Sequence, residues 1–182
     1  MIATLKKLFM QVFGKTNKNM NYHQLIYGTS ILLTGLLAGL FFGFQCSIIN
    51  GLGALGNREY LLSFQSINRV IQNPVFLISF MGPVIVLPIT CYLNYKIGGS
   101  DLFPYILSSA LIYLIAVFGI TISCNVPLNE MLDGLNIQSA SDSQLQDMRL
   151  KFEAGWNKWH LIRTIASIAS FTALIIPLIK RI

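Results

Sequence analysis

Charged side chains are scarce in this sequence, at 11% of 182 residues, whereas soluble domains commonly contain about 25%. Hydrophobic residues make up 54% of the chain, and the mean hydropathy is +0.62. With so few charges, most of the protein surface cannot face water. The composition therefore excludes an ordinary soluble protein and predicts a single membrane domain.

The sequence also lacks the short motifs of several cofactor and metal sites. It contains no GxGxxG or P-loop pattern, and its three cysteines form no CxxC pair. His23 and His160 fall at opposite membrane faces in the topology derived below, so they cannot share a metal ion. We therefore expect no metal and no cofactor. Cys46 and Cys124 fall near one face, which leaves two alternatives, a disulfide or two small buried hydrophobic side chains.

The net charge of +6 does not indicate a nucleic-acid partner, because the basic residues form no patch interleaved with aromatic residues. They lie instead at the ends of the apolar segments. This placement is typical of topology signals that face anionic lipid. Membrane lipid is accordingly an expected partner.

Four long runs with little or no charge predict four transmembrane helices, at residues of about 25–49, 75–95, 102–123 and 156–179. Each run has the roughly 20 residues that a helix needs to cross the hydrocarbon core. We predict an all-α membrane protein, a four-transmembrane-helix bundle with short amphipathic helices on the extracytoplasmic side. Residues 21–182 would form this single domain.

Both termini are expected in the cytoplasm of a bacterial inner (plasma) membrane. The flanks that would share the cytoplasmic side contain seven basic residues and one acid, whereas the other connections mix six of each. Residues 1–20 are predicted as a separate amphipathic segment on that surface, because Leu5, Leu8 and Phe9 share a helical face.

The two extracytoplasmic connections contain predicted helices. Residues 60–72 have one apolar face and end before an Asn-Pro break. In the second connection, Asn125 is a suitable cap for a short helix that begins at Val126. The sequence SDSQ at residues 141–144 is a capping box, and helical periodicity then continues from residue 142 to 179.

Gly35, Gly39 and Gly43 recur at four-residue spacing in the first span. Such a stripe lets another helix approach closely, either within the chain or in a second copy of a homo-oligomer. We favour a partner in the same chain.

A stripe of aromatic, basic and polar side chains enters the fourth span. It has two interpretations, an aromatic belt with a snorkelling arginine or a polar pocket that faces the bundle. An inward Arg163 is favoured, because charges within a span usually face the interior. Other polar residues reach a similar depth. The stripe and these residues are Trp156, Trp159, His160, Arg163 and Ser167, with Gln45, Asn68, Gln72 and Asn125.

Three segments together, QSINRVIQNPVF, NVPLNEML and FEAGWNKWHLIRT, resemble the anthrone oxygenase-like family of small four-span membrane proteins. The resemblance implies oxidation of anthrones to anthraquinones without a metal or flavin. It also implies a lipophilic polycyclic aromatic or quinone-like substrate in a pocket of the outer leaflet. The family's pattern falls on Asn68, Asn73, Pro74, Asn125, Pro127, Asn129, Trp156, Trp159 and Arg163.

Such a site needs a base, a cation and aromatic walls. His160 is the candidate base because imidazole exchanges protons near neutral pH, and Arg163 is the candidate stabiliser of the oxyanion. Glu130 and Glu153 are alternative bases, although charges on a helix surface are the commoner interpretation of both. The candidate substrate-binding residues are Asn68, Asn125, Asn129, Trp156 and Trp159.

A second class of function remains open at this point, a noncatalytic membrane scaffold, subunit or lipid-binding protein. A transporter is less favoured, because a single charge within the spans offers no evident ion path.

Overall fold

The computed structural model describes residues 22–96 and 101–180. The predicted segment 1–20 lies outside these residues. All regular structure in the described ranges is helical, and four of the helices are long and apolar enough to cross a membrane. The predicted fold class, an all-α four-span bundle, is confirmed.

The first span is three to four residues longer at each end than predicted, and the second agrees with its predicted position to within one residue. Helix α2 (Tyr22–Gly43), the π-helix η1 (Phe44–Ile48) and α3 (Ile49–Gly53) form one uninterrupted helix. It passes the predicted end at residue 49 because its glycines keep helical backbone angles. The second span is α5 (Pro74–Lys96).

The third span is a single long helix with two π-helical stretches. It comprises α6 (Phe103–Ile112), η2 (Tyr113–Gly119), η3 (Thr121–Asn125) and α7 (Val126–Asp133). The predicted helix cap at Asn125 is wrong. Its backbone is helical, with φ −80° and ψ −40°, and its side chain makes no capping bond, because the π-helical turn continues into α7 without a break.

Helix α8 (Asp142–Ile179) has the predicted bounds. Its capping box is also confirmed, since the side chains of Ser141 and Gln144 each accept a hydrogen bond from the other's backbone amide. Helix α4 (Asn57–Val70) begins three residues earlier than predicted and ends before the Asn-Pro break.

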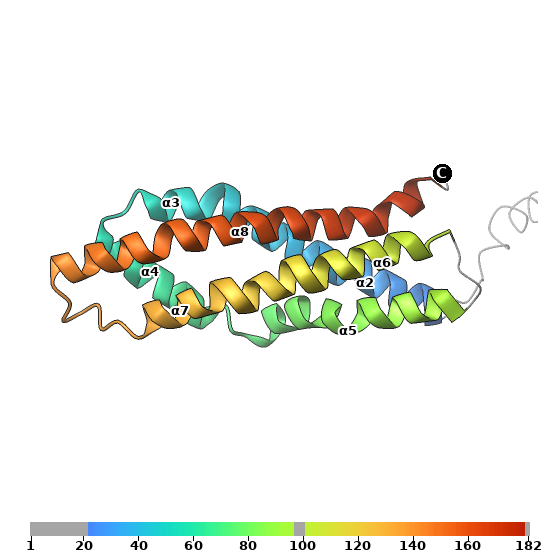
Figure 1. The fold of residues 1–182 in the computed structure, drawn as a ribbon, viewed down its shortest axis with the longest axis horizontal. Helices are drawn as coiled ribbons and strands as arrows, with labels where there is room; N and C mark the ends of the chain where they lie inside the picture. Colours follow the sequence, from blue (N-terminus) through green and yellow to red (C-terminus); the bar gives the residue numbers. More distant parts are fainter. Residues whose placement is uncertain (1–21, 97–100, 181–182) are drawn as a thin grey trace, which may run out of the picture.

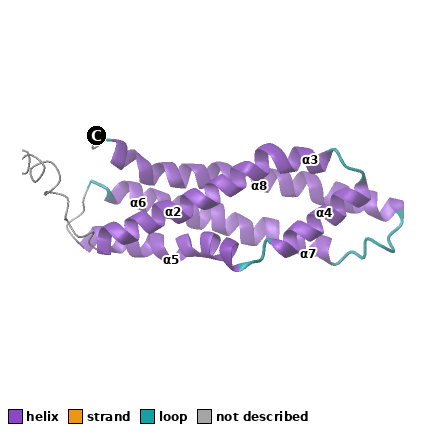
Figure 2. Cartoon of the chain, turned by 180° about the vertical axis from the view of Figure 1, so that it is seen from behind, coloured by secondary structure: helices purple, strands orange, loops and turns teal. Residues whose placement is uncertain are grey.

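The bundle has a membrane-spanning part and an end that we call the cap, formed by α3, α4, α7 and the first half of α8 (Figures 1 and 2). The first residue of α5, Pro74, marks the end of this helix that is nearer the cap, and α4 and α7 extend beyond that end (Figure 1). Each part has its own apolar core. Leu37, Leu87 and Leu174 are buried in the spanning part, whereas Phe64 and Phe152 are buried in the cap.

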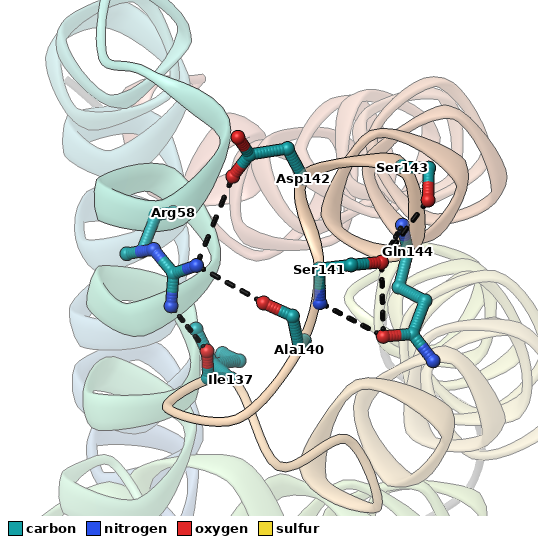
Figure 3. Close-up of polar contacts among 7 residues, drawn as sticks. All are labelled: Arg58, Ile137, Ala140, Ser141, Asp142, Ser143 and Gln144. Carbon is teal, nitrogen blue, oxygen red and sulfur yellow. Dashed lines mark hydrogen bonds and ion pairs between the residues drawn. The ribbon is translucent and has the colours of Figure 1, made fainter.

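Three polar side chains of α4 attach α7 and the loop that follows it. Gln65 is buried and donates to the carbonyl oxygens of Leu132 at 2.7 Å and Leu135 at 2.9 Å. Arg58 donates to two carbonyl oxygens of the loop before α8 and lies near its first residue (Figure 3). Arg69 forms an ion pair with the last residue of α7. These bonds position α7 relative to α4.

Within the spanning part, two of the polar contacts between helices join small side chains. Ser30 pairs with Thr90, and Ser109 pairs with Ser170, each at an oxygen–oxygen distance of 2.9 Å. Such bonds satisfy polar groups where lipid offers no partner. Cys46 and Cys124 are unpaired thiols, so the disulfide alternative is not realised.

The glycine stripe makes its close contact within the chain, as favoured from the sequence. A Cβ atom on Gly35 would lie 2.9 Å from a ring carbon of Phe171 in α8, whereas Gly39 and Gly43 have open space. Only the first of the three glycines therefore needs to lack a side chain for α2 to meet α8.

We predict that Gly35→Ala lowers the melting temperature in detergent, because the added methyl group forces apart packed helices at a cost of about 1–3 kcal/mol. Gly39→Ala is the matched control, since nothing lies within 4 Å of its added Cβ atom. Circular dichroism against temperature checks both variants. Equal melting temperatures for the two would contradict this account of the α2–α8 contact.

Candidate functional site

A cavity of about 720 Å³ lies where the spanning part meets the cap. Its walls come from both apolar cores, with Phe41 and Phe80 from one and Trp156 from the other. It lies beside the start of α5, and α4, α7 and α8 also contribute lining residues. The lining residues are Leu40, Phe41, Phe44, Ile67, Asn68, Arg69, Ile71, Gln72, Phe76, Leu77, Phe80, Met81, Thr121, Ile122, Val126, Asn129, Glu130, Asp133, Gly134, Trp156, His160 and Arg163.

Helix α8 contributes Trp156, His160 and Arg163 to the cavity from one face, since they lie four and three residues apart. The Trp156 and His160 rings are stacked, with centroids 4.9 Å apart. The Arg163 guanidinium lies 4.5 Å from the ring centroid of Phe41 and 5.2 Å from that of Trp156. Arg163 is 7% exposed, so it faces the interior as the sequence predicts.

The contacts of Arg163 assign the tautomer of His160. Nε and Nη2 of Arg163 lie 3.2 and 3.0 Å from His160 Nδ1. A guanidinium has only donors, so Nδ1 accepts and has no proton. The ring proton is therefore on Nε2, which donates to the Phe41 carbonyl oxygen at 3.2 Å. His160 is thus a neutral imidazole whose lone pair is already bonded to Arg163.

Arg163 has no acidic partner among residues 22–96 and 101–180. The ion pairs within the described residues involve Arg58, Arg69 and Arg149, and none includes Arg163. Its remaining partner is the hydroxyl of Thr121, at 3.3 Å from Nη1. A buried charge without a counter-ion is costly, and its remaining N–H groups are available to a ligand.

The three candidate asparagines have different environments. Asn129 lines the cavity and accepts a hydrogen bond from Trp156 Nε1 at 2.7 Å. Asn125 is fully buried behind the wall, where its Nδ2 donates to the Trp156 carbonyl oxygen at 3.3 Å. Asn68 lines the cavity, is 8% exposed, and its Nδ2 atom has no partner within the described residues. Asn68 is therefore an unused donor in the wall.

Trp159 is not among the lining residues. It is half-buried, and the ammonium of Lys158 lies 5.1 Å from its ring centroid. Of the other polar residues expected at this depth, Gln72 lines the cavity and Gln45 does not. The predicted stripe thus divides into a cavity face and an outer face of α8.

Acidic side chains occur on the α7 wall. Val126, Asn129, Glu130 and Asp133 share one face of α7 at helical spacing and line the cavity together. Asp133 accepts from Arg69 Nε at 2.7 Å. Glu130 is exposed at the rim, and no hydrogen bond or ion pair of its carboxylate occurs within the described residues. This rim contrasts with the apolar walls deeper in the cavity.

The alternative base Glu153 lies outside the cavity, in the cap. Its carboxylate accepts from Arg149 Nε at 2.7 Å. Burial raises the pKa of the nearby Tyr60 phenol, and the charge of Glu153 raises it further. Neither group faces the cavity, so both belong to the packing of the cap.

Sequence reasoning missed the aromatic walls from α2 and α5 and the π-helical turns beside them. Phe44 begins η1, and Thr121 begins η3, so a π-helical turn lies at two walls of the cavity. Such turns frequently occur at functional sites. A π-helical turn has no composition of its own, so no local signal indicates it.

In the described ranges, no three His, Cys, Asp or Glu side chains lie close enough to hold a metal ion. The polar and aromatic groups that line the cavity are aromatic rings, an imidazole, amides, a hydroxyl, two guanidinium groups and carboxylates.

These features define an integral membrane protein of four helical spans with a partly polar cavity at one end of the bundle. The family model of anthrone oxygenase matches residues 76–173, more than half of the chain. The chain therefore belongs to the anthrone oxygenase family. The match includes the cavity residues of α7 and α8 but begins after Asn68. A search of curated proteins and a search of solved structures gave no match.

We predict opposite stability effects for two amides of α4. Gln65→Leu removes both hydrogen bonds to α7 and costs about 1–3 kcal/mol. Asn68→Leu removes a buried donor that has no partner, so the melting temperature stays the same or rises. Thermal unfolding in detergent checks both. A loss with Asn68→Leu as large as with Gln65→Leu would show that Asn68 has a structural bond.

Proposed function

We propose that the cavity binds a lipophilic polycyclic aromatic ketone of the anthrone type and that the protein catalyses its oxygenation by dioxygen. The family membership supports this class of reaction. The observation that carries the proposal is the Arg163 guanidinium, which is buried among aromatic rings and has no carboxylate partner in the part of the chain that the structure describes. A ligand that becomes an anion during the reaction supplies the missing charge.

The reaction uses the acidity of the methylene group of an anthrone. Loss of one methylene proton gives a carbanion whose charge spreads to the ketone oxygen as a phenolate. Carbon then bonds to dioxygen to give a hydroperoxide. Loss of the second proton from carbon breaks the O–O bond and forms a new ketone. One oxygen atom stays in the quinone and the other leaves as water, so atoms and electrons balance.

Arg163 is suited to stabilise the phenolate oxygen. Its guanidinium is held by His160 and Thr121 before a ligand arrives, so little reorganisation is needed as charge develops. His160 then acts first as a positioning residue, because its Nδ1 lone pair is bonded to the guanidinium. Asn68 lines the same cavity, and its Nδ2 atom is a buried donor without a partner within the described residues.

The size and the walls of the cavity fit an aromatic ligand. Its volume of about 720 Å³ is within the range of small-molecule pockets, about 300–1,000 Å³. Aromatic rings from α2, η1, α5 and α8 supply flat apolar surfaces. These are the side chains of Phe41, Phe44, Phe76, Phe80 and Trp156.

The ligand would enter from the bilayer. Several apolar lining residues are also exposed, including Leu77 at 44%, Met81 at 40% and Ile122 at 46%. They belong to α5 and η3 within the candidate spans, where the bundle would contact lipid. A lipophilic substrate dissolved in the membrane would reach the cavity without crossing water.

We predict that Arg163→Gln lowers the oxidation of a hydroxylated anthrone about 10²–10³-fold, the usual effect of removing one oxyanion donor. Purified protein in detergent is assayed by dioxygen uptake and quinone absorbance, after subtraction of the protein-free rate. Lys158→Gln is the matched control, because Lys158 is exposed on the same helix and does not line the cavity.

Two results would contradict the proposal. One is an Arg163→Gln variant that turns over the anthrone at the wild-type rate. The other is wild-type protein that does not accelerate oxidation and retains only phospholipid by mass spectrometry. The second result would favour a noncatalytic lipid-binding protein.

A further inference from the structure

We propose that Glu130 is the catalytic base that removes the methylene proton of the substrate. This inference rests on the proposed function and names the residue that begins the reaction. It follows from which basic groups of the cavity are already bonded and from where Glu130 lies relative to Arg163.

The cavity face of α7 ends in three polar side chains, and two of them have partners. Asn129 accepts from the Trp156 indole, and Asp133 accepts from Arg69. Glu130 lies between them in sequence and lines the same cavity. Its carboxylate has no partner within the described residues. Glu130 therefore offers lone pairs to a ligand without breaking a bond of the fold.

The competing base in the cavity is less available. His160 Nδ1 is covered by Nε and Nη2 of Arg163, and its Nε2 has the ring proton. For His160 to take a substrate proton, Arg163 would have to move away from the imidazole. That movement would disturb the cation just as negative charge develops.

Glu130 and Arg163 line the same cavity from different helices. Glu130 belongs to α7 and Arg163 to α8, and the two form no ion pair, although both line the cavity. In an anthrone, the methylene group and the ketone oxygen lie on opposite sides of the central ring. A bound ring can therefore present its methylene group to Glu130 and its ketone oxygen to Arg163.

The Glu130 carboxylate takes part in every proton transfer of the reaction and is regenerated at the end. Glu130 takes the first methylene proton, and the electron pair of the C–H bond moves to the ketone oxygen beside Arg163. After carbon bonds to dioxygen, protonated Glu130 gives its proton to the peroxide oxygen. Glu130 then removes the second proton from carbon as the O–O bond breaks. The departing hydroxide takes that proton and becomes water, which restores the carboxylate.

Because Glu130 is exposed, removal of the methylene proton can be measured separately from the oxidation, as exchange with solvent deuterium. Because the carboxylate reaches solvent at the rim, its proton exchanges with water. Without dioxygen, the carbanion can only take a proton back. Wild-type protein in deuterium oxide should therefore replace methylene hydrogen by deuterium in a hydroxylated anthrone, and mass spectrometry measures the rate.

We predict that Glu130→Gln slows this anaerobic exchange by about 10²-fold or more, the usual contribution of a general base. The affinity for the product-like hydroxyanthraquinone, measured by quenching of tryptophan fluorescence, should stay unchanged. Glu59→Gln is the matched control, because Glu59 is an exposed carboxylate of α4 that does not line the cavity. Exchange in the control should equal that of the wild type.

The outcomes separate this inference from the proposed function. If wild-type protein neither exchanges nor oxidises the anthrone, the proposed function fails. If wild-type protein does both and Glu130→Gln exchanges at the same rate, the assignment of Glu130 is overturned. Loss of quinone affinity in Glu130→Gln together with loss of exchange would also overturn it, because it would indicate a binding role.

Discussion

A positive charge enclosed by aromatic rings is the constraint on which the site depends. The Arg163 guanidinium is held by a neutral imidazole and a hydroxyl group, and no carboxylate within the described residues reaches it. A bundle selected for stability alone would neutralise such a group or place it in water. The position of Arg163 is therefore better explained by what it does to a ligand than by what it does for the fold.

The architecture makes room for that charge. The protein has two apolar cores, and residues of both line the cavity beside the start of α5. Side chains of α4 hydrogen-bond to α7 and form an ion pair with it. These bonds hold α7 in place as one wall of the cavity. The same cavity is lined by the exposed carboxylates of Glu130 and Asp133 and by apolar side chains that would face lipid. A lipophilic substrate and a proton donor or acceptor can meet there.

Much of the fold was predictable from local patterns. Hydropathy indicated the four spans, and the SDSQ capping box indicated the start of α8. The inward turn of Arg163 followed from the cost of a charge in lipid. Other features depended on contacts between distant segments. Trp159 lies only one residue from His160, yet it is on the outer face of α8, and periodicity alone did not resolve that boundary. The sequence did not predict the π-helical turns or the bond from Asn125 to Trp156, because it did not indicate that the third span continues as one helix through Asn125.

The most direct test of the central claim compares two ligands that differ in charge. A hydroxyanthraquinone that can ionise and its O-methylated form, which cannot, are titrated into wild-type protein and into Arg163→Gln at a pH where the first ligand is an anion. The account predicts that wild-type protein binds the anion at least about tenfold more tightly, or about 1.4 kcal/mol, and that Arg163→Gln loses this preference. Equal affinities of wild-type protein for the two ligands would contradict the claim that the cavity is built around an uncompensated charge.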